Sequence, residues 1–153
     1  MSTAANCIFC QILAGQADAS FVYRDERVAA FMDLFPVTPG HTLVVPISHH
    51  EHFSQVDPAC AGRMFELGRA VGAALLRTDL GEGVSYFLAE GELAGQVVPH
   101  AHLHVIPRFA GDHCALRLHQ GPVPRAGRDA LERSAYALRD ALETSPQSSS
   151  RDG

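Results

Sequence analysis

Two absences restrict the partners and compartments open to this chain. No stretch approaches the roughly 18 consecutive apolar residues of a membrane-spanning helix, and residues 1–7 contain no basic segment followed by an apolar run. We therefore expect a soluble, cytoplasmic protein without a membrane partner. Basic charge is scarce too, because 12 Lys and Arg stand against 17 Asp and Glu, a formal net charge of −5. Clustered Lys and Arg bind nucleic-acid backbones, so we expect no nucleic-acid partner and only a small phosphate ligand.

The length and composition are those of one globular domain. A chain of 153 residues supports a single hydrophobic core, and 46% hydrophobic residues are sufficient to fill it. Residues 145–153 are rich in Ser and contain nothing apolar to bury. We therefore predict a single domain over residues 1–144 and a disordered tail over residues 145–153.

Hydrophobic spacing predicts an α+β fold. Helices are indicated where apolar residues recur three or four positions apart, and strands where short runs rich in Val and Phe are bounded by turn residues. An antiparallel sheet with its helices against one face would leave the other face free for a ligand. The predicted helices are residues 7–13, 57–77 and 129–142, and the predicted strands are residues 20–24, 28–33, 41–46, 83–89 and 97–107.

Three histidines alternate with apolar residues in the last of these strands. The period of two in a strand places His100, His102 and His104 on one face and the intervening residues in the core. At a rise of roughly 3.3 Å per residue, neighbours in the row lie about 6.6 Å apart and the outer pair about 13 Å apart. One metal ion cannot easily hold all three, so the row should divide its roles. A histidine-rich exposed face is the plainer alternative, and strict alternation disfavours it.

A second pattern, Cys7-x-x-Cys10, has the spacing of a metal knuckle or a redox motif. Two thiolates on one turn need two more ligands to complete a tetrahedral zinc site, and His49 and His100 are the candidates. A closed site of this kind would be structural and would pin the N-terminal helix to the sheet.

The sequence leaves alternatives to this zinc site open. His50 and His52 compete with His49 on composition alone. A redox role for the cysteine pair is the functional rival, and two buried thiols without a ligand are the structural one. We favour zinc because the pair does not follow a strand in a βαβ pattern, as a thioredoxin-like motif should.

His102 and His104 are then left for chemistry. A neutral imidazole is a competent nucleophile, and its attack on phosphorus would form a phosphoryl-histidine bond that water hydrolyses. His104 would hydrogen-bond the phosphoryl oxygens or the leaving group. Gly95 and Gln96, just upstream, offer a close backbone approach and an amide donor for an anionic oxygen.

With these motifs the chain resembles the histidine triad (HIT) proteins, whose hallmark is the sequence His-φ-His-φ-His-φ-φ, in which φ is an apolar residue. Here the motif is His100-Ala-His102-Leu-His104-Val-Ile. The resemblance implies an α+β half-barrel with a five-stranded antiparallel sheet, usually a homodimer. It also implies nucleotidyl transfer to water from purine nucleoside phosphoramidates, acyl-adenylates or dinucleoside polyphosphates. The other segments that carry the resemblance are residues 7–10, 31–36, 39–46 and 94–108.

The resemblance also implies roles for individual residues. His102 aligns with the nucleophile, oriented by the backbone carbonyl of His100, and His104 would bind phosphate. Asp33 aligns with the residue that holds the ribose hydroxyls, although it has a plainer interpretation as a turn cap. His41 lies beside the site in a supporting role. The remaining matches are Phe9, Ile12, Leu34 and Leu43 for the apolar base pocket, Gln96 for a phosphate-side donor, and Cys7, Cys10, His49 and His100 for the zinc ligands. The four apolar residues have a plainer interpretation as core.

Two positions depart from the family pattern. Ala89 falls where many members carry Asn or Gln, and Val97 falls where many carry Ser or Thr. Each loses a polar contact worth about 1–3 kcal/mol if the partner oxygen stays unsatisfied, so we expect slow activity or a shifted substrate. The loss of these polar groups motivates a second hypothesis, a non-catalytic nucleotide-binding regulatory protein of the same fold. A third hypothesis is a metalloenzyme that uses an adjacent histidine pair as an open zinc site.

Overall fold

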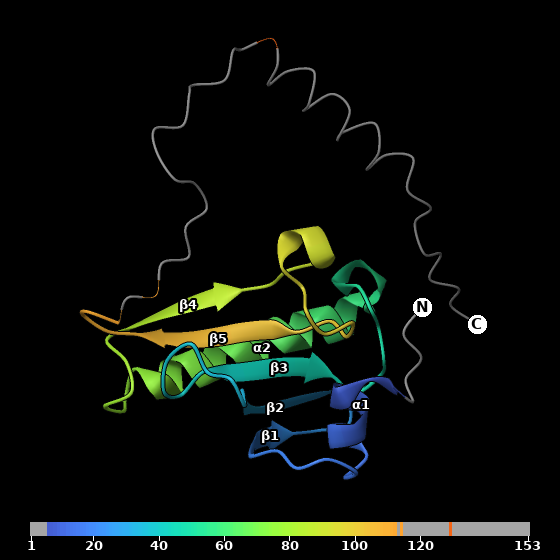
Figure 1. Cartoon of the computed structure of the whole chain (residues 1–153), viewed down its shortest axis with the longest axis horizontal. Coiled ribbons are helices and arrows are strands. Elements are labelled where there is room, and N and C mark those ends of the chain that lie inside the picture. The colour runs from blue at the N-terminus through green and yellow to red at the C-terminus, as the bar shows by residue number, and fades with distance from the viewer. Residues whose placement is uncertain (1–5, 113, 115–128, 130–153) are drawn as a thin grey trace. The chain divides into compact units, whose positions relative to one another are not determined.

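The computed structural model describes residues 6–112, 114 and 129 of the chain (Figure 1). The predicted helix over residues 129–142, Asp129 apart, and the predicted tail over residues 145–153 lie outside these described residues. No described helix is both long and apolar enough to cross a membrane. In chain order the elements are α1 (Ile8–Leu13), β1 (Phe21–Arg24), β2 (Val28–Met32), β3 (Thr42–Pro46), η2 (Phe53–Gln55), α2 (Pro58–Leu75), β4 (Gly83–Phe87), η3 (Glu92–Ala94) and β5 (Leu103–Arg108).

The strands form one five-stranded antiparallel sheet in the order β1-β2-β3-β5-β4. Asp25 forms the turn between β1 and β2, because its Oδ1 accepts the backbone N–H groups of Arg27 and Val28, each at 2.8 Å. The strands predicted over residues 20–24 and 28–33 are therefore joined as an antiparallel hairpin. The predicted α+β class with a five-stranded antiparallel sheet is confirmed.

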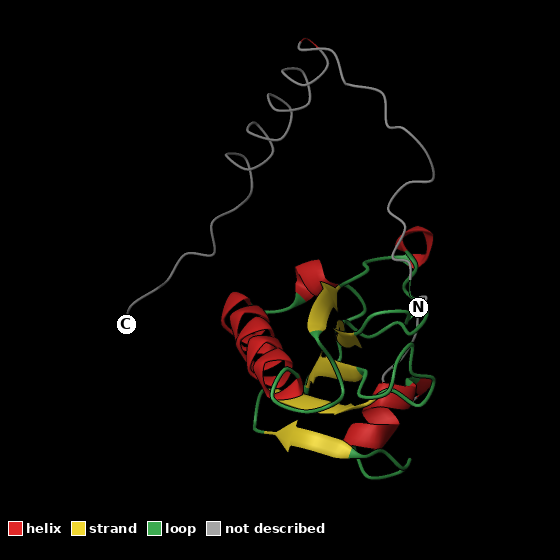
Figure 2. Ribbon diagram, turned by 90° about the vertical axis from the view of Figure 1, so that its left-hand side faces the viewer, coloured by secondary structure: helices red, strands yellow, loops and turns green. Residues whose placement is uncertain are grey.

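Helix α2 begins where the sequence predicts it. The Asp57 carboxylate accepts the backbone N–H groups of Ala59 and Cys60 at 3.0 and 3.1 Å, and Pro58 occupies the first helical position. The buried face of α2 packs on one face of the sheet, as Figure 2 shows. Its core consists of Met64, Leu67, Val71 and Leu75 from the helix and Val28, Ala30, Val44, Leu103 and Val105 from the strands.

Helix α1 lies against the opposite face of the sheet, with the sheet between the two helices (Figure 2). Its residues Phe9, Ile12 and Leu13 pack on the strand residues that alternate with those facing α2. The predicted placement of all helices on one face therefore describes α2 but not α1. The reason is that β2 and β3 are apolar on both faces, so each face needs a cover. The strand residues beneath α1 are Ala29, Phe31, Leu43 and Val45.

Strand β5 begins at Leu103, six residues later than predicted. Pro99 has no N–H for a strand ladder, and the His100 N–H donates to the Val98 carbonyl at 2.8 Å in a tight turn. His100 and His102 therefore precede the strand, and only His104 lies in it. The prediction of one continuous strand carrying all three histidines is wrong at its first two positions.

Candidate functional site

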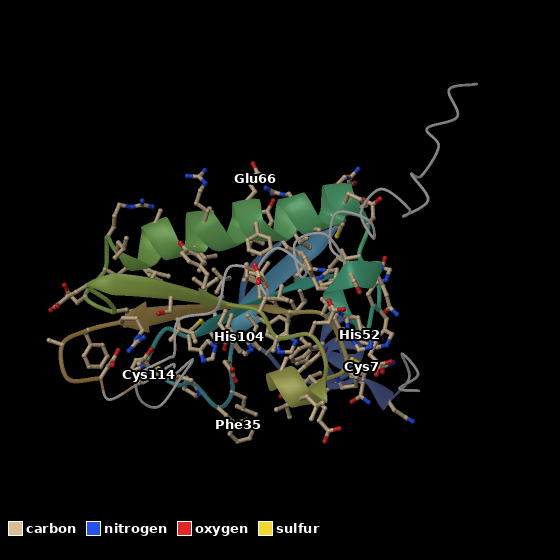
Figure 3. The ribbon with its side chains drawn as sticks, turned by 90° about the horizontal axis from the view of Figure 1, so that it is seen from above. Cys7, Phe35, His52, Glu66, His104 and Cys114 are labelled. Carbon is tan, nitrogen blue, oxygen red and sulfur yellow. The ribbon has the colours of Figure 1, made fainter. Side chains whose placement is uncertain are left out.

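His104 points to the face of the sheet that α1 covers. In the strand register it lies opposite Leu43 of β3 and Phe87 of β4. Figure 3 shows His104 on the other side of the sheet from Glu66, which lies on α2. The His102 ring lies beside it, with 4.7 Å between the two ring centroids. The structure thus brings together the two histidines that the sequence assigned to chemistry.

The His102 ring is oriented by the main chain. Its Nδ1 lies 2.6 Å from the carbonyl oxygen of His100, and the ring is 5% exposed. A carbonyl oxygen only accepts hydrogen bonds, so Nδ1 carries the proton and Nε2 keeps its lone pair. Burial lowers the pKa of His102, while the His100 carbonyl and the Asp33 carboxylate raise it. The side chain is a neutral imidazole with one free nitrogen lone pair.

His104 is hydrogen-bonded to His41, the residue just before β3. Its Nδ1 lies 2.9 Å from Nε2 of His41, whose side chain is 2% exposed. Burial, together with smaller effects of the neighbouring His102 and His41, lowers the pKa of His104 to about 4, against the opposing effect of Asp33. Burial also lowers the pKa of His41, against the opposing effect of Asp33. Both rings are therefore neutral at physiological pH.

Asp33 follows β2 and faces the same cluster. Its Oδ1 accepts the backbone N–H of Phe35 at 2.9 Å, which caps the turn after the strand. Its Oδ2 lies 3.5 Å from His41 Nδ1, and the side chain is 18% exposed. One carboxylate oxygen is thus used in the turn, and the other borders the histidines.

The predicted zinc ligands form a second cluster. The ligand atoms of Cys7, Cys10, His49 and His100 all lie within 4.8 Å of one another. His100 Nδ1 lies 3.4 Å from Cys7 Sγ and 3.6 Å from Cys10 Sγ, and His49 Nδ1 lies 3.3 Å from Cys10 Sγ. A tetrahedral zinc ion with bonds of about 2.3 Å to sulfur and 2.0 Å to nitrogen sets these atoms about 3.6 Å apart. The spacing fits zinc.

The surroundings of the second cluster also fit a metal. His100 Nε2 lies 2.9 Å from the Pro46 carbonyl oxygen, so it donates its proton there and leaves the Nδ1 lone pair facing the thiols. Burial and, to a smaller extent, the neighbouring Cys7 thiol raise the pKa of the Cys10 thiol to about 11. Bound zinc would remove that penalty by stabilising the thiolates. The four ligands leave no open position for a substrate, and His50 and His52 are not among them.

The side-chain amide of Gln96 is not free to donate a hydrogen bond to phosphate. Its Nε2 donates to the carbonyl oxygens of Glu51 and Val98 at 2.7 and 3.0 Å, and its Oε1 accepts the Gly91 N–H at 2.7 Å. Both amide hydrogens are therefore engaged with the backbone. In this structure Gln96 ties the 91–98 loop to the segment after β3.

The four predicted base-pocket residues are not alike. Phe9, Ile12 and Leu43 are buried between α1 and the sheet, and the Phe9 ring also contacts the His102 ring, with centroids 5.3 Å apart. Leu34 is 83% exposed. Three of the four thus serve as core here, and Phe9 links that core to the histidines. Of the two departures, Ala89 is buried, whereas Val97 is 90% exposed.

The contact between His41 and His104 was not predicted from the sequence. The two residues are 63 positions apart, and only the pairing of β3 with β5 brings them together. The available signal was local: His41 directly follows Pro39 and Gly40, at the start of a predicted strand. That signal places His41 at the first position of the predicted strand but does not show which residue it contacts.

The chain is similar in sequence and in fold to proteins of one family. The HIT domain family model matches residues 14–111. An uncharacterized HIT-like protein of Saccharolobus solfataricus is 39% identical over 106 residues, which are 69% of this chain and 76% of that protein. A HIT family protein structure from Bacillus anthracis has 35% identity and a TM-score of 0.77, covering 91% of this chain and 99% of that one. A zinc-bound histidine triad family protein from Mycobacterium smegmatis has 32% identity and a TM-score of 0.70, covering 92% and 99%.

Proposed function

The chain belongs to the histidine triad (HIT) family, and from this premise we propose that it is a nucleotide hydrolase acting through a nucleotidyl-histidine intermediate. Family membership supports nucleotide binding or hydrolase-type chemistry in general. The proposed substrates are purine nucleoside phosphoramidates or dinucleoside polyphosphates, cleaved at the α-phosphate. His102 is the proposed nucleophile and His104 the proposed phosphate ligand.

One observation carries this proposal: the 2.6 Å contact between His102 Nδ1 and the His100 carbonyl oxygen. It holds the proton on Nδ1 and keeps the Nε2 lone pair available. That lone pair would form a bond to the α-phosphorus while the bond from phosphorus to the leaving group breaks. The leaving group departs with the bonding electrons and takes up a proton. The imidazolium ring so formed is stabilised by the same carbonyl oxygen.

The second half of the reaction restores the histidine. Water attacks the α-phosphorus and loses a proton, and the bond between Nε2 and phosphorus breaks. The electron pair of that bond returns to Nε2, and a nucleoside monophosphate leaves. Two displacements at one phosphorus atom replace one direct attack by water.

The ribose and the base would bind next to these histidines. Asp33 Oδ2, which borders His41, is the proposed acceptor for the ribose hydroxyls. Phe9, Ile12 and Leu43 would form the inner wall of the base pocket, and the exposed Leu34 its outer wall. Gln96 would support the phosphate side by holding its loop, since its own amide hydrogens are engaged.

We also propose that Cys7, Cys10, His49 and His100 bind a structural zinc ion. These ligands come from the start of α1, the segment after β3 and the turn before β5. When bound, the metal would cross-link three segments that are distant in sequence. His100 would thereby fix the carbonyl oxygen that orients His102, so that the metal supports catalysis only through positioning.

The direct test is AMP release from an adenosine phosphoramidate. Wild type is expected to turn over, and His102→Ala is expected to lose on the order of a thousandfold or more in rate, because no other group would form the intermediate. His50→Ala is the matched control, since His50 lies outside both clusters. Equal rates for wild type and His102→Ala would refute the nucleophile assignment.

A second candidate, a non-catalytic nucleotide-binding protein, is favoured by the poor supply of donors on the phosphate side. Gln96 is engaged with backbone groups, and Ala89 and Val97 carry no polar atom in their side chains. AMP binding without turnover of phosphoramidates, adenylates or dinucleoside polyphosphates would select this candidate. The closed geometry of Cys7, Cys10, His49 and His100 gives no support to an open catalytic zinc site at those four residues.

The oligomeric state and the domain extent form the last part of the proposal. We propose a homodimer of one domain spanning residues 1–144. Strand β4 is at an edge of the sheet, and its Tyr86 is 47% exposed, beside an α2 whose Phe65 is 48% exposed. Edge strands with apolar neighbours are templates for pairing with another chain. Light scattering during size exclusion measures the mass directly.

A further inference from the structure

We propose that His41 is a positioning residue that fixes the tautomer of His104, so that His104 presents an N–H at Nε2 to a phosphoryl oxygen of the substrate. The inference rests on the proposed function for what His104 donates to. The tautomer itself is a property of the free protein and is measured without any substrate.

The main chain around His41 determines which of its ring nitrogens carries the proton. The backbone N–H of Val37 donates to His41 Nδ1 at 3.1 Å. A backbone N–H only donates, so Nδ1 must offer a lone pair. In a neutral imidazole the proton then lies on Nε2. The loop between β2 and β3 thereby selects the tautomer of His41.

The tautomer of His41 in turn determines the tautomer of His104. His41 Nε2 lies 2.9 Å from His104 Nδ1. Because Nε2 of His41 carries the proton, Nδ1 of His104 must accept it as a hydrogen bond, and the His104 proton lies on Nε2. The two rings are tilted by 40° with centroids 5.1 Å apart, which brings the nitrogens together edge to edge.

A charged His41 would break this arrangement. Its Nδ1–H would face the Val37 N–H, and two donors 3.1 Å apart repel. The Asp33 carboxylate, 3.5 Å away, favours the charge, while the neighbouring His102 and His104 disfavour it. His41 is 2% exposed, so water does not compensate. The neutral form satisfies Val37 and His104 at once.

The result is a pair of adjacent histidines with opposite tautomers. His102 has its proton on Nδ1, against the His100 carbonyl, and a free lone pair on Nε2. His104 has its lone pair on Nδ1, against His41, and a free N–H on Nε2. One ring is equipped to attack phosphorus and the other to donate to its oxygens. A preorganised neutral donor of this kind stabilises negative charge on the phosphoryl group without moving a proton.

The test separates the two hydrogen bonds of His41 with a matched pair of variants. The amide nitrogen of Gln lies near the position of histidine Nε2, so His41→Gln keeps the donor to His104 and loses the acceptor for Val37. The amide oxygen of Asn lies near the position of Nδ1, so His41→Asn keeps the acceptor and loses the donor. Thermal unfolding of both variants verifies that each is folded.

Ring-nitrogen NMR of the ¹⁵N-histidine-labelled, zinc-loaded full chain measures the tautomers. Wild type and His41→Gln are expected to show His104 protonated at Nε2, and His41→Asn a mixture of tautomers. In AMP release, His41→Asn is expected to lose on the order of a hundredfold in kcat/KM, the effect of losing a preorganised donor, with His41→Gln within about tenfold of wild type. His104 protonated at Nδ1 in wild type would overturn the proposal, as would equal tautomers and equal rates in the two variants. Absence of turnover by wild type would instead refute the proposed function.

Discussion

Gly68 of α2 lies so close to Leu103 of β5 that a Cβ at this position would be 2.7 Å from Leu103 Cδ2. Leu103 is 1% exposed and stands between His102 and His104 in the chain. The contact therefore sets the distance between α2 and the strand that carries the site. Helix packing on one face of the sheet is coupled to histidine positions on the other.

Gly68→Ala is accordingly expected to lower the free energy of unfolding by about 1–3 kcal/mol, because a packed leucine must move. Gly62→Ala is the matched control on the same helix, where an added Cβ meets nothing within 4 Å. It is expected to raise stability by up to about 1 kcal/mol through helix propensity. Urea denaturation measures both. A Gly68→Ala protein as stable as Gly62→Ala would contradict the close approach.

The metal site makes a second prediction. Cys10→Ser is expected to lose stoichiometric zinc, with a fall in the free energy of unfolding on the order of 3 kcal/mol, the linkage expected for a tightly bound ligand. Cys60→Ser is the control, because the Cys60 thiol lies outside the cluster and contacts the Arg27 carbonyl at 3.6 Å. Metal analysis of the purified proteins decides. Full zinc content in Cys10→Ser would show that the ligand set is different.

Val97 makes a third prediction, because it stands where many family members carry a hydroxyl. The side chain is 90% exposed, so Val97→Ser should leave the fold unchanged. One added hydrogen bond to phosphate, worth about 1 kcal/mol, would raise kcat/KM about fivefold. Leu93→Ser, at another fully exposed apolar position in the same loop, serves as the control. If the two variants change the rate equally, the position has no special contact with substrate.

The buried histidines predict how stability depends on pH. Burial holds the pKa of His104 at about 4, whereas an unfolded histidine titrates near pH 6.5. Between these values the unfolded chain binds more protons, so the free energy of unfolding falls as the pH falls from about 6.5 to about 4. This group contributes up to about 3 kcal/mol to that fall, and nothing above about pH 7.5. Urea titrations across this range should give a shallower slope for His104→Asn, and an unchanged slope would place the titration elsewhere.

Local features of the fold were predictable because their causes are local. Asp57 caps the N-terminus of α2 and Pro58 occupies its first position, and both effects involve only neighbouring residues. Cys7 and Cys10 lie at the start of α1, and their spacing alone indicated two neighbouring thiols. Both inferences needed no knowledge of the sheet.

Features that depend on distant contacts, or on a turn inside an alternating pattern, were not predictable. The pairing of His41 with His104 follows from the register of β3 against β5, which the sequence does not display. The late start of β5 follows from Pro99 and the tight turn at His100, which override the alternating pattern. The engagement of Gln96 depends on Glu51, a residue 45 positions away. The histidine pairing and the engagement of Gln96 are long-range contacts, whereas the turn before β5 is a local break in an alternating pattern.

Covalent modification of His102 during turnover is tested most directly by intact-mass analysis. A single turnover of adenosine phosphoramidate is quenched rapidly in base, and the protein and its peptides are weighed. We expect a transient mass increase of one adenylyl group on the peptide containing His102, and none in His102→Ala. AMP release by wild type without any adduct, or with the adduct on another residue, would contradict the account.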